Sequence, residues 1–354
     1  MYKFLIYISY AYAIPIGRPL EYEIKKRGYE IKWFSELETA KRKLIQEELD
    51  VLNDIRDVLA YRPDIVLAAA NDVPDFINAL KVQIFHGFHA EKRKGEIGHF
   101  RIRGFFDLYC TQGPSTTSEF KDLQKKHRHF EVIETGWPKV DPLFPINKKS
   151  NRKVPTIMIA STFTPRLSLA YNEEVFQAIR KISETGKFRI FMVLHPKMPE
   201  AIVAKWKSLN NKHFTFFDTT DLIPLFKQAD FMFADTTSAI QEFLLQRKPV
   251  VTFRHSQKKD YLIQIEEASQ IDASFEKALH CPEEIMNSIE KYILQLHPYF
   301  DGRSSERLIS AVIEFLHKDK SYLKRKPLNL ARKYRIRKQL HYFTWKSYNR
   351  PFRK

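Results

Sequence analysis

The sequence predicts an α/β protein with two doubly wound parallel sheets that face a central cleft, followed by a basic helical tail. Its 354 residues are enough for two domains with separate cores. Short apolar runs typical of buried parallel strands alternate with helical segments, and this alternation occurs twice. A polar, basic stretch flanked by prolines, Pro145 to Pro155, separates the two sets. We therefore expect Rossmann-like domains over residues 1–150 and 151–317, and a basic, aromatic tail over residues 318–354.

The first half of the chain shows the expected order of elements. A strand, KFLIYISY, precedes a helical segment that Gly28 ends, and a second strand follows. The charged segment ELETAKRKLIQEELDVLNDIRDVLAYRP has leucines at helical spacing and Pro63 after its end, which predicts a helix. Further strands are expected at DIVLAAA, VQIFHG, FFDLYCTQG and FEVIETGWP.

The second half repeats this organisation without repeating the sequence. A strand, TIMIAST, precedes the helix NEEVFQAIRKISETG, and strands are expected at FRIFMVLHP and FTFFD. The segment ADFMFADTTSAIQEFLLQRKPVVTF predicts a strand, a helix and another strand. Alternation of this kind is typical of a second doubly wound sheet.

Composition indicates a folded, cytoplasmic protein. Apolar and aromatic residues make up 44% of the chain, which argues against disorder. No apolar run reaches the roughly 18 residues that span a bilayer, and the N-terminal MYKFLIYISYAYAIP alternates like a buried strand rather than a signal peptide. Cys110 and Cys281 form no disulfide framework, and no cluster has metal-ligand spacing. We expect neither a structural metal nor a cofactor.

Polar side chains follow four of the predicted strands, at the edge where parallel sheets bind their ligands. They include imidazoles, hydroxyls, a carboxylate and an ammonium group, which suit phosphate binding and proton transfer. The candidate site residues are His86, Gly87, Ser161, Thr162, His195, Lys197, Asp235, Thr236, Thr237 and Ser238.

Each of these patterns has a structural alternative. Hydroxyl residues between a strand and a helix, as in DTTSAIQEFL, can cap the helix while its free N–H groups face an anion. Thr237 and Ser238 would then donate to a diphosphate; the alternative is a plain N-cap. His86 is either a general base near neutral pH or a structural histidine, and Gly87 would let a ligand or backbone approach. His195 either packs at a strand end or donates to phosphate.

Several segments occur in the order found in a known enzyme family. They are the strand and His-Gly pair of Val82–Gly87, DLYCTQG, VIETGWPKVDPLF, LHPKMP, ADFMFADTTSAIQEFLLQRKPVVTF and DGRSSERLISAVIEFL. Over about residues 80–316 the chain thereby resembles the CDP-glycerol glycerophosphotransferase family. This resemblance implies a GT-B fold. It also implies transfer of a polyol phosphate, foremost glycerol phosphate, from a CDP-activated donor to a lipid-linked or saccharide acceptor, with release of CMP. Such transfers build teichoic-acid-like, capsular or lipopolysaccharide polymers.

The resemblance also implies roles for individual residues. His86 would deprotonate the acceptor hydroxyl, and His195, Thr237 and Ser238 would hold the donor diphosphate, with support from Lys197. Glu242, four residues after Ser238, would face the same site and bind the ribose.

Two positions depart from that family's pattern, and a second resemblance competes with the first. Phe88-His89 stands where Thr-Pro is usual, so His89 could share or take the role of His86. Asp235–Ser238 keeps the hydroxyls of the usual Asp-Tyr-Ser-Ser but loses its aromatic ring. AIQEFLLQRKPVV and DGRSSERL also resemble UDP-N-acetylglucosamine 2-epimerases and related GT-B glycosyltransferases. An enzyme that uses a UDP-sugar is therefore the alternative, although His86-Gly87 is not expected in an epimerase.

The tail carries most of the net charge. The chain has a formal charge of +17, and the segment from Lys318 contributes +13 of it through fourteen Lys and Arg and one acid. Tyr342, Phe343 and Trp345 stand among these cations, which suits peripheral binding to an anionic membrane, where each cation contributes about 1 kcal/mol. Nucleic-acid binding is a remote alternative, because the body contains no recognised module for it. A flexible solvated tail is the other alternative.

Overall fold

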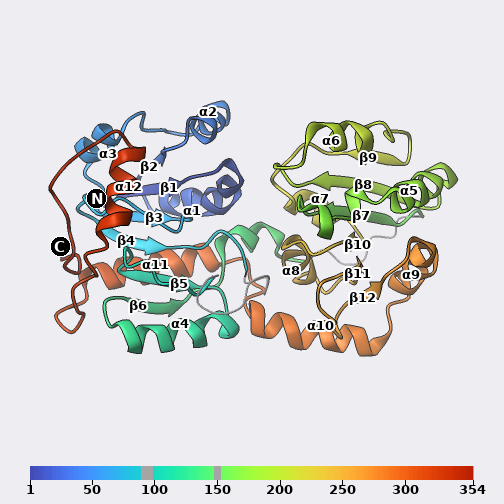
Figure 1. Cartoon of the computed structure of the whole chain (residues 1–354). Coiled ribbons are helices and arrows are strands. Elements are labelled where there is room, and N and C mark those ends of the chain that lie inside the picture. The colour runs from blue at the N-terminus through green and yellow to red at the C-terminus, as the bar shows by residue number, and fades with distance from the viewer. Residues whose placement is uncertain (89–98, 147–152, 354) are drawn as a thin grey trace. The chain divides into compact units, whose positions relative to one another are not determined.

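The structure is a computed structural model that describes residues 1–88, 99–146 and 153–353, and it contains two compact units (Figure 1). Unit 1 comprises residues 1–142 and 296–354, and unit 2 comprises residues 143–295. Each unit has one six-stranded parallel sheet with helices, which confirms the predicted α/β class. The division along the chain differs from the predicted one, because the helix Ser304–His317 and the tail belong to unit 1. The middle of the predicted linker, 147–152, lies outside the described residues.

The sheet of unit 1 has its topological switch point between β1 and β3. Its strands pair in parallel in the order β2-β1-β3-β4-β5-β6. From β1 the chain moves to β2 on one side and then to β3 on the other, which opens a crevice beyond the carboxyl ends of these strands. The strands are β1 (Lys3–Ile8), β2 (Glu30–Ser35), β3 (Ile65–Ala68), β4 (Leu80–Gln83), β5 (Leu108–Thr111) and β6 (Glu131–Glu134).

One predicted helix of unit 1 is in fact two. The chain between α2 and α3 runs extended beside β2, where Val51 forms a parallel bridge with Trp33. Two backbone hydrogen bonds of 2.8 Å, from Trp33 N to Asp50 O and from Leu52 N to Trp33 O, replace the helical ones. The helices of unit 1 are α1 (Ile14–Lys26), α2 (Glu38–Gln46), α3 (Ile55–Tyr61), α4 (Pro114–His127), α11 (Ser304–His317) and α12 (Leu330–Gln339), with the short η1 (Ala11–Ala13). The 3-10 helix η3 (Pro138–Leu143) follows β6 and ends at the start of unit 2.

The sheet of unit 2 has a comparable switch point between β7 and β10. Its parallel order is β12-β11-β10-β7-β8-β9. The strands are β7 (Thr156–Ser161), β8 (Arg189–Leu194), β9 (Phe214–Phe216), β10 (Phe231–Ala234), β11 (Val250–Phe253) and β12 (Ile263–Ile265). Its helices are α5 (Glu173–Thr185), α6 (Glu200–Lys207), α7 (Ile223–Gln228), α8 (Ala239–Leu244) and α9 (Ile271–Leu279), and α10 (Glu283–Leu296) leads back to unit 1. Three 3-10 turns, η4 (Pro165–Leu167), η5 (Leu169–Tyr171) and η6 (Ala268–Gln270), complete it.

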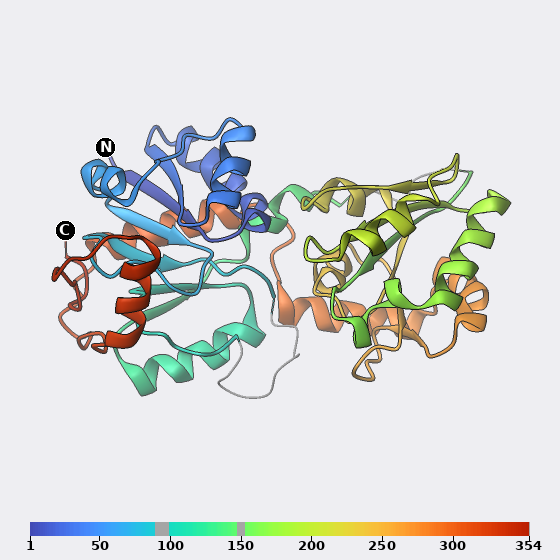
Figure 2. The same cartoon turned by 45° about the horizontal axis from the view of Figure 1, so that its top comes forward.

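The basic tail folds back onto unit 1, as its red ribbon shows in both views (Figures 1 and 2). Ile336 of α12 is buried in the apolar core of unit 1. Two buried ion pairs fix the tail: Lys326 Nζ lies 2.7 Å from Asp107 Oδ1, and Arg337 Nη1 lies 2.7 Å from Asp75 Oδ1. Part of the charge excess therefore serves the fold rather than a partner.

No helix among the described residues is long and apolar enough to cross a membrane.

Candidate functional site

The carboxyl edge of the unit 2 sheet gathers most of the predicted site residues. Ser161 ends β7, His195 follows β8 and Asp235 follows β10, and these three strands are neighbours in the sheet. The strand-end rule therefore selected residues that lie along one edge. Their burial and hydrogen bonds divide them into a supporting group and an accessible group.

Asp235 is the buried carboxylate that holds the loops of this edge together. Its side chain is 0% exposed. It accepts hydrogen bonds from Ser161 Oγ (2.5 Å), from Thr162 N (3.0 Å) and from Leu169 N (3.0 Å). A buried carboxylate is stable when N–H and O–H donors surround it in this way. Asp235 thus ties the loop after β7 to the end of β10.

The other buried members also support the loops. Thr236 is buried, and its Oγ1 accepts from Ser256 N (3.3 Å), which fixes the loop after β11. Ser161 and Thr162 are buried beside Asp235. Glu242 is buried on α8. Its contact with ribose stays a prediction, and the ribose would have to reach a side chain that is almost inaccessible.

Four predicted residues remain open to solvent at this edge: His195 and Thr237 are half-buried, and Lys197 and Ser238 are exposed. His195 Nδ1 accepts a hydrogen bond from Lys197 N (3.1 Å), so the neutral ring carries its proton on Nε2. The His195 ring packs against Phe163, with 4.5 Å between ring centres. Nε2–H and the Lys197 ammonium group are therefore donors that suit an anion.

The start of α8 differs from the predicted cap. Ser238 occupies the N-cap position but makes no capping hydrogen bond, and Thr237 Oγ1 instead accepts from Ala239 N at 3.4 Å. The Ser238 hydroxyl is thereby left facing solvent. Because α8 has only six residues, its dipole adds little to anion binding.

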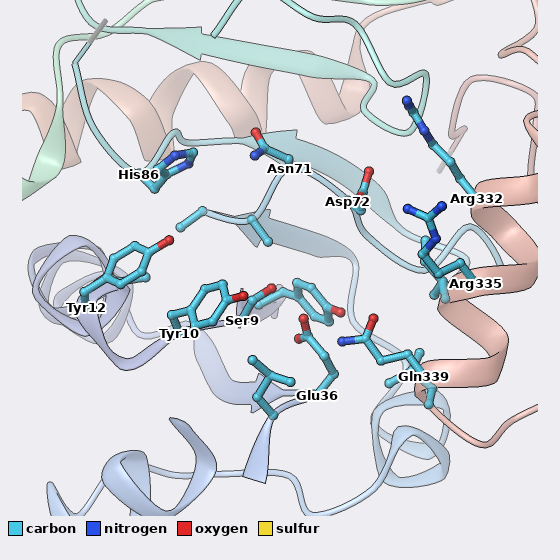
Figure 3. Close-up of a pocket in the computed structure, with 17 residues that line it drawn as sticks. Ser9, Tyr10, Tyr12, Glu36, Asn71, Asp72, His86, Arg332, Arg335 and Gln339 are labelled. Carbon is cyan, nitrogen blue, oxygen red and sulfur yellow. The ribbon is translucent and has the colours of Figure 1, made fainter. Parts of the chain in front are cut away.

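Unit 1 contains a second polar crevice, a cavity of about 310 Å³ at its switch point (Figure 3). His86 is the one predicted site residue in its lining. The polar and aromatic lining residues are Tyr7, Ser9, Tyr10, Tyr12, Glu36, Asn71, Asp72, His86, Arg332, Arg335 and Gln339.

His86 reaches this cavity through an unusual backbone turn. Phe85, directly before it, adopts a left-handed conformation (φ +58°), which is costly for an aromatic residue. Desolvation lowers the pKa of His86; a hydrogen bond to the backbone of Ala69 opposes this shift, and the positive charge of Arg103 adds to it. A lowered pKa favours the neutral imidazole, which can accept a proton.

Two expectations around His86, the roles of Gly87 and His89 in binding, stay predictions. Among the described residues, a Cβ on Gly87 would meet no atom within 4 Å, and the φ of Gly87 is not positive. Neither close packing against this part of the chain nor backbone conformation therefore requires glycine there. His89 lies outside the described residues.

Sequence reasoning missed the rest of the cavity. Tyr10, Glu36 and Asp72 follow β1, β2 and β3, so the strand-end rule could have found them. Arg332 and Arg335 come from the tail, and nothing local in the sequence indicates that α12 returns to this crevice. Within the described part of the chain, no group of three His, Cys, Asp or Glu could hold a metal ion.

Two doubly wound parallel sheets, each with polar groups at its switch point, define an α/β protein with a GT-B-like fold. The chain belongs to the UDP-N-acetylglucosamine 2-epimerase family, whose model matches residues 112–313, more than half of its length. A search of the curated proteins found no match.

Solved structures of similar fold include epimerases and a polymerase. MnaA of S. aureus, solved with UDP, is 14% identical, with 92% of this chain and 99% of that chain covered and a TM-score of 0.60. The UDP-GlcNAc 2-epimerase of Neisseria meningitidis, solved with UDP-GlcNAc, is 12% identical, with coverages of 89% and 100% and a TM-score of 0.55. The wall teichoic acid polymerase TagF is 12% identical, with coverages of 89% and 88% and a TM-score of 0.65. At these identities the likeness establishes the fold.

The family match overturns the predicted CDP-glycerol glycerophosphotransferase. The segments behind that prediction are mostly strand ends and the turns that follow them, and both TagF and the epimerases share this scaffold with the chain. Such segments report the fold and do not discriminate between its enzymes. The expected polyol phosphate donor and CMP release are withdrawn with the prediction, and the UDP-sugar alternative is the better reading.

Proposed function

We propose that the protein inverts the configuration at carbon 2 of a UDP-linked N-acetylamino sugar and supplies cell-surface polysaccharide synthesis. The family match supports this most, because residues 112–313 include every strand end of unit 2. The similar structures solved with UDP and with UDP-GlcNAc support the same substrate class. In this proposal the nucleotide diphosphate binds at the carboxyl edge of the unit 2 sheet.

The accessible residues of that edge would hold the diphosphate. His195 Nε2–H, the Ser238 hydroxyl and the Lys197 ammonium group donate to phosphate oxygens, and Asp235 keeps the loops beneath them in place. Donors fixed in advance stabilise negative charge on the nucleotide without reorganisation.

The reaction itself has a direct isotopic signature. Inversion at carbon 2 requires the C2–H bond to break and to re-form on the opposite face, with a base to accept the proton. In D₂O, UDP-GlcNAc should therefore give its C2 epimer with deuterium at C2, followed by proton NMR. A glycosyltransferase would instead release UDP in the presence of an acceptor and leave C2–H unlabelled, and that result would contradict the proposal.

Replacing His195 by alanine should lower kcat/KM for the UDP-sugar about 10- to 100-fold, because a hydrogen bond to a charged group is worth about 1.5–3 kcal/mol. His213→Ala is the matched control. His213 precedes β9 and so lies at the amino edge of the same sheet, and its loss should leave kcat/KM unchanged. Equal activity in the two variants would remove His195 from the proposed diphosphate site.

We also propose that the exposed part of the tail binds an anionic membrane surface. Trp345, Phe343 and Leu330 are largely exposed apolar side chains, at 102%, 65% and 71%. Exposed cations such as Lys346 and Arg350 stand near them in sequence. Aromatic side chains enter the headgroup layer while neighbouring cations meet the anionic lipids.

The double substitution Phe343→Ser, Trp345→Ser should weaken co-sedimentation with vesicles of phosphatidylglycerol and phosphatidylcholine at least tenfold, because it removes the apolar anchors and keeps the charge. Tyr22→Ser, at an exposed aromatic of α1, is the control and should bind like the wild type. Unchanged binding of the double variant, or equal binding to purely neutral vesicles, would contradict membrane docking through this tail.

A further inference from the structure

We propose that the cavity of unit 1 is a separate binding site for an anionic sugar, and that α12 of the tail completes it. This goes beyond epimerisation, which needs only the nucleotide sugar. The ligand class is a saccharide unit that carries a phosphate or a carboxylate. Every residue of the cavity lies within unit 1.

The cavity has the position and the size of a ligand site. It lies beyond the carboxyl ends of β1, β2 and β3, at the switch point where open α/β sheets bind small molecules. Its volume of about 310 Å³ falls at the lower end of the range for such sites, which is about 300–1,000 Å³. A single sugar ring with one charged substituent is a suitable occupant.

Two carboxylates of the lining offer acceptors for sugar hydroxyls. The single oxygens Glu36 Oε2 and Asp72 Oδ1 are buried and have no close hydrogen-bond partner among the described residues. The Glu36 carboxyl as a whole also interacts with the hydroxyls of Ser9 and Tyr7, and the Asp72 side chain is 48% exposed. Asp72 Oδ1 has only a distant cation, Arg103 Nε at 3.9 Å. Each of these two oxygens can accept a further hydrogen bond, and a ligand with several hydroxyl groups would supply the donors. Burial also raises the pKa of Glu36.

Aromatic rings line the same cavity. Tyr10 and Tyr12 stack on one another, with 5.5 Å between ring centres and 12° between ring planes. Tyr12 also approaches His86, at 6.4 Å between ring centres. Ring faces of this kind cover the apolar C–H face of a sugar while its hydroxyls reach the polar groups.

The arginines of α12 supply the charge selectivity. Arg332 and Arg335 are three residues apart and therefore share a face of α12, and both extend toward the cavity from the side away from Tyr12 (Figure 3). Neither forms an ion pair with any described residue, in contrast to Arg337, which binds Asp75. Guanidinium groups bind phosphate or carboxylate in a bidentate manner. A neutral sugar would leave both guanidinium groups of this face unused.

Two faces of α12 have separate roles: one anchors the helix to unit 1, and the other lines the cavity. Lys333 and Arg337, on another face of the helix, are buried against Asp75 and fix the position of α12. Because the anchor is independent of Arg332 and Arg335, these two can be changed without releasing the helix. The family match ends at residue 313, before α12 begins.

Isothermal titration of the full-length protein tests the ligand class with four probes: N-acetylglucosamine 6-phosphate, glucuronic acid, N-acetylglucosamine and inorganic phosphate. We expect one or both anionic sugars to bind at least tenfold more tightly than the neutral sugar and than phosphate alone. The two anionic probes distinguish phosphate from carboxylate as the source of charge. Equal affinity for neutral and anionic sugars would overturn the proposal.

Substitutions in the cavity lining test whether the sugar binds in this cavity. Arg332→Gln combined with Arg335→Gln should abolish the preference for the anionic sugar, and Glu36→Gln should weaken binding of every sugar about tenfold. Arg325→Gln, at an exposed tail arginine outside the cavity lining, is the control and should bind like the wild type. An unchanged preference in the double variant would refute the site.

A parallel UDP titration keeps this test separate from the proposed function. UDP affinity should be the same in all of these variants, because their residues belong to unit 1. If the wild-type protein did not bind UDP, only the proposed function would be contradicted. If UDP and the anionic sugar competed for binding, the separate site would be refuted.

Discussion

Replacement of Asp235 by alanine should abolish UDP binding and lower the free energy of unfolding by about 3–5 kcal/mol. The change leaves Ser161 Oγ–H, Thr162 N–H and Leu169 N–H buried without their acceptor. Each buried donor left unsatisfied costs about 1–3 kcal/mol. Since the loop after β7 would lose its tether to β10, the proposed nucleotide-binding edge would lose its shape. Urea unfolding and the rise in melting temperature with added UDP measure the two effects.

The same strand offers a matched control. Asp230, directly before β10, accepts a hydrogen bond from Thr156 N at 2.7 Å and so joins the amino ends of β10 and β7. Asp230→Ala should also reduce stability, yet UDP should still raise its melting temperature. If both variants kept the response to UDP, or both lost it, the assignment of Asp235 as the support of the nucleotide edge would be wrong.

The sequence predicted the sheets well because their strands are buried on both faces. Apolar runs such as KFLIYI and TIMIAS have few alternatives to a central parallel strand, and they became β1 and β7. The segment between α2 and α3 was predicted wrongly for a non-local reason. Val51 forms a parallel bridge with Trp33 of β2, the edge strand of the sheet. The spacing of leucines within one segment contains no information about such a distant pairing.

The candidate site could be located from sequence, but its members could not be ranked. Ser161, Asp235 and Ser238 all follow buried strands and look equivalent in the sequence. The structure separates them by burial: Asp235 and Ser161 support the loops, whereas Ser238 is exposed. The choice between enzyme families failed for a related reason, because strand-end segments belong to the fold that the families share.

The net charge of the tail does not by itself predict its function, because several of its cations are buried in ion pairs. Its excess of Lys and Arg suggested a surface for membranes or nucleic acid, yet Lys326, Lys333 and Arg337 are buried. Their partners, Asp107 and Asp75, lie more than 200 residues earlier in the chain, so the ion pairs are invisible before the fold is known. Only the exposed remainder is available to a partner.

Replacement of Asp75 by alanine should lower the free energy of unfolding of unit 1 by about 3–5 kcal/mol, because it leaves buried cations without their counter-ion. Asp75 accepts hydrogen bonds from Arg337 Nη1 (2.7 Å) and Ser347 Oγ (2.6 Å), and Lys333 Nζ lies 3.5 Å away. Burial alone would raise the pKa of Asp75, but these partners lower it overall, so the charged form stabilises the fold. Urea unfolding followed by tryptophan fluorescence measures the loss, and limited proteolysis should show release of the tail.

A second substitution distinguishes two causes of this loss of stability, the buried cations left without a counter-ion and the lost packing of the Asp75 side chain. In the double variant Asp75→Ala, Arg337→Met, one stranded cation is removed and the apolar stem is kept, so part of the stability should return. Asp122→Ala removes an exposed ion pair with Lys125 and should change stability by less than about 1 kcal/mol. If Asp75→Ala behaved like Asp122→Ala, the tail would be a loosely attached segment and α12 could not hold Arg332 and Arg335 at the cavity. If it behaves as expected, truncation of the tail would damage unit 1 itself. Membrane binding and sugar binding must then be tested with point substitutions that leave the Asp75 anchor in place.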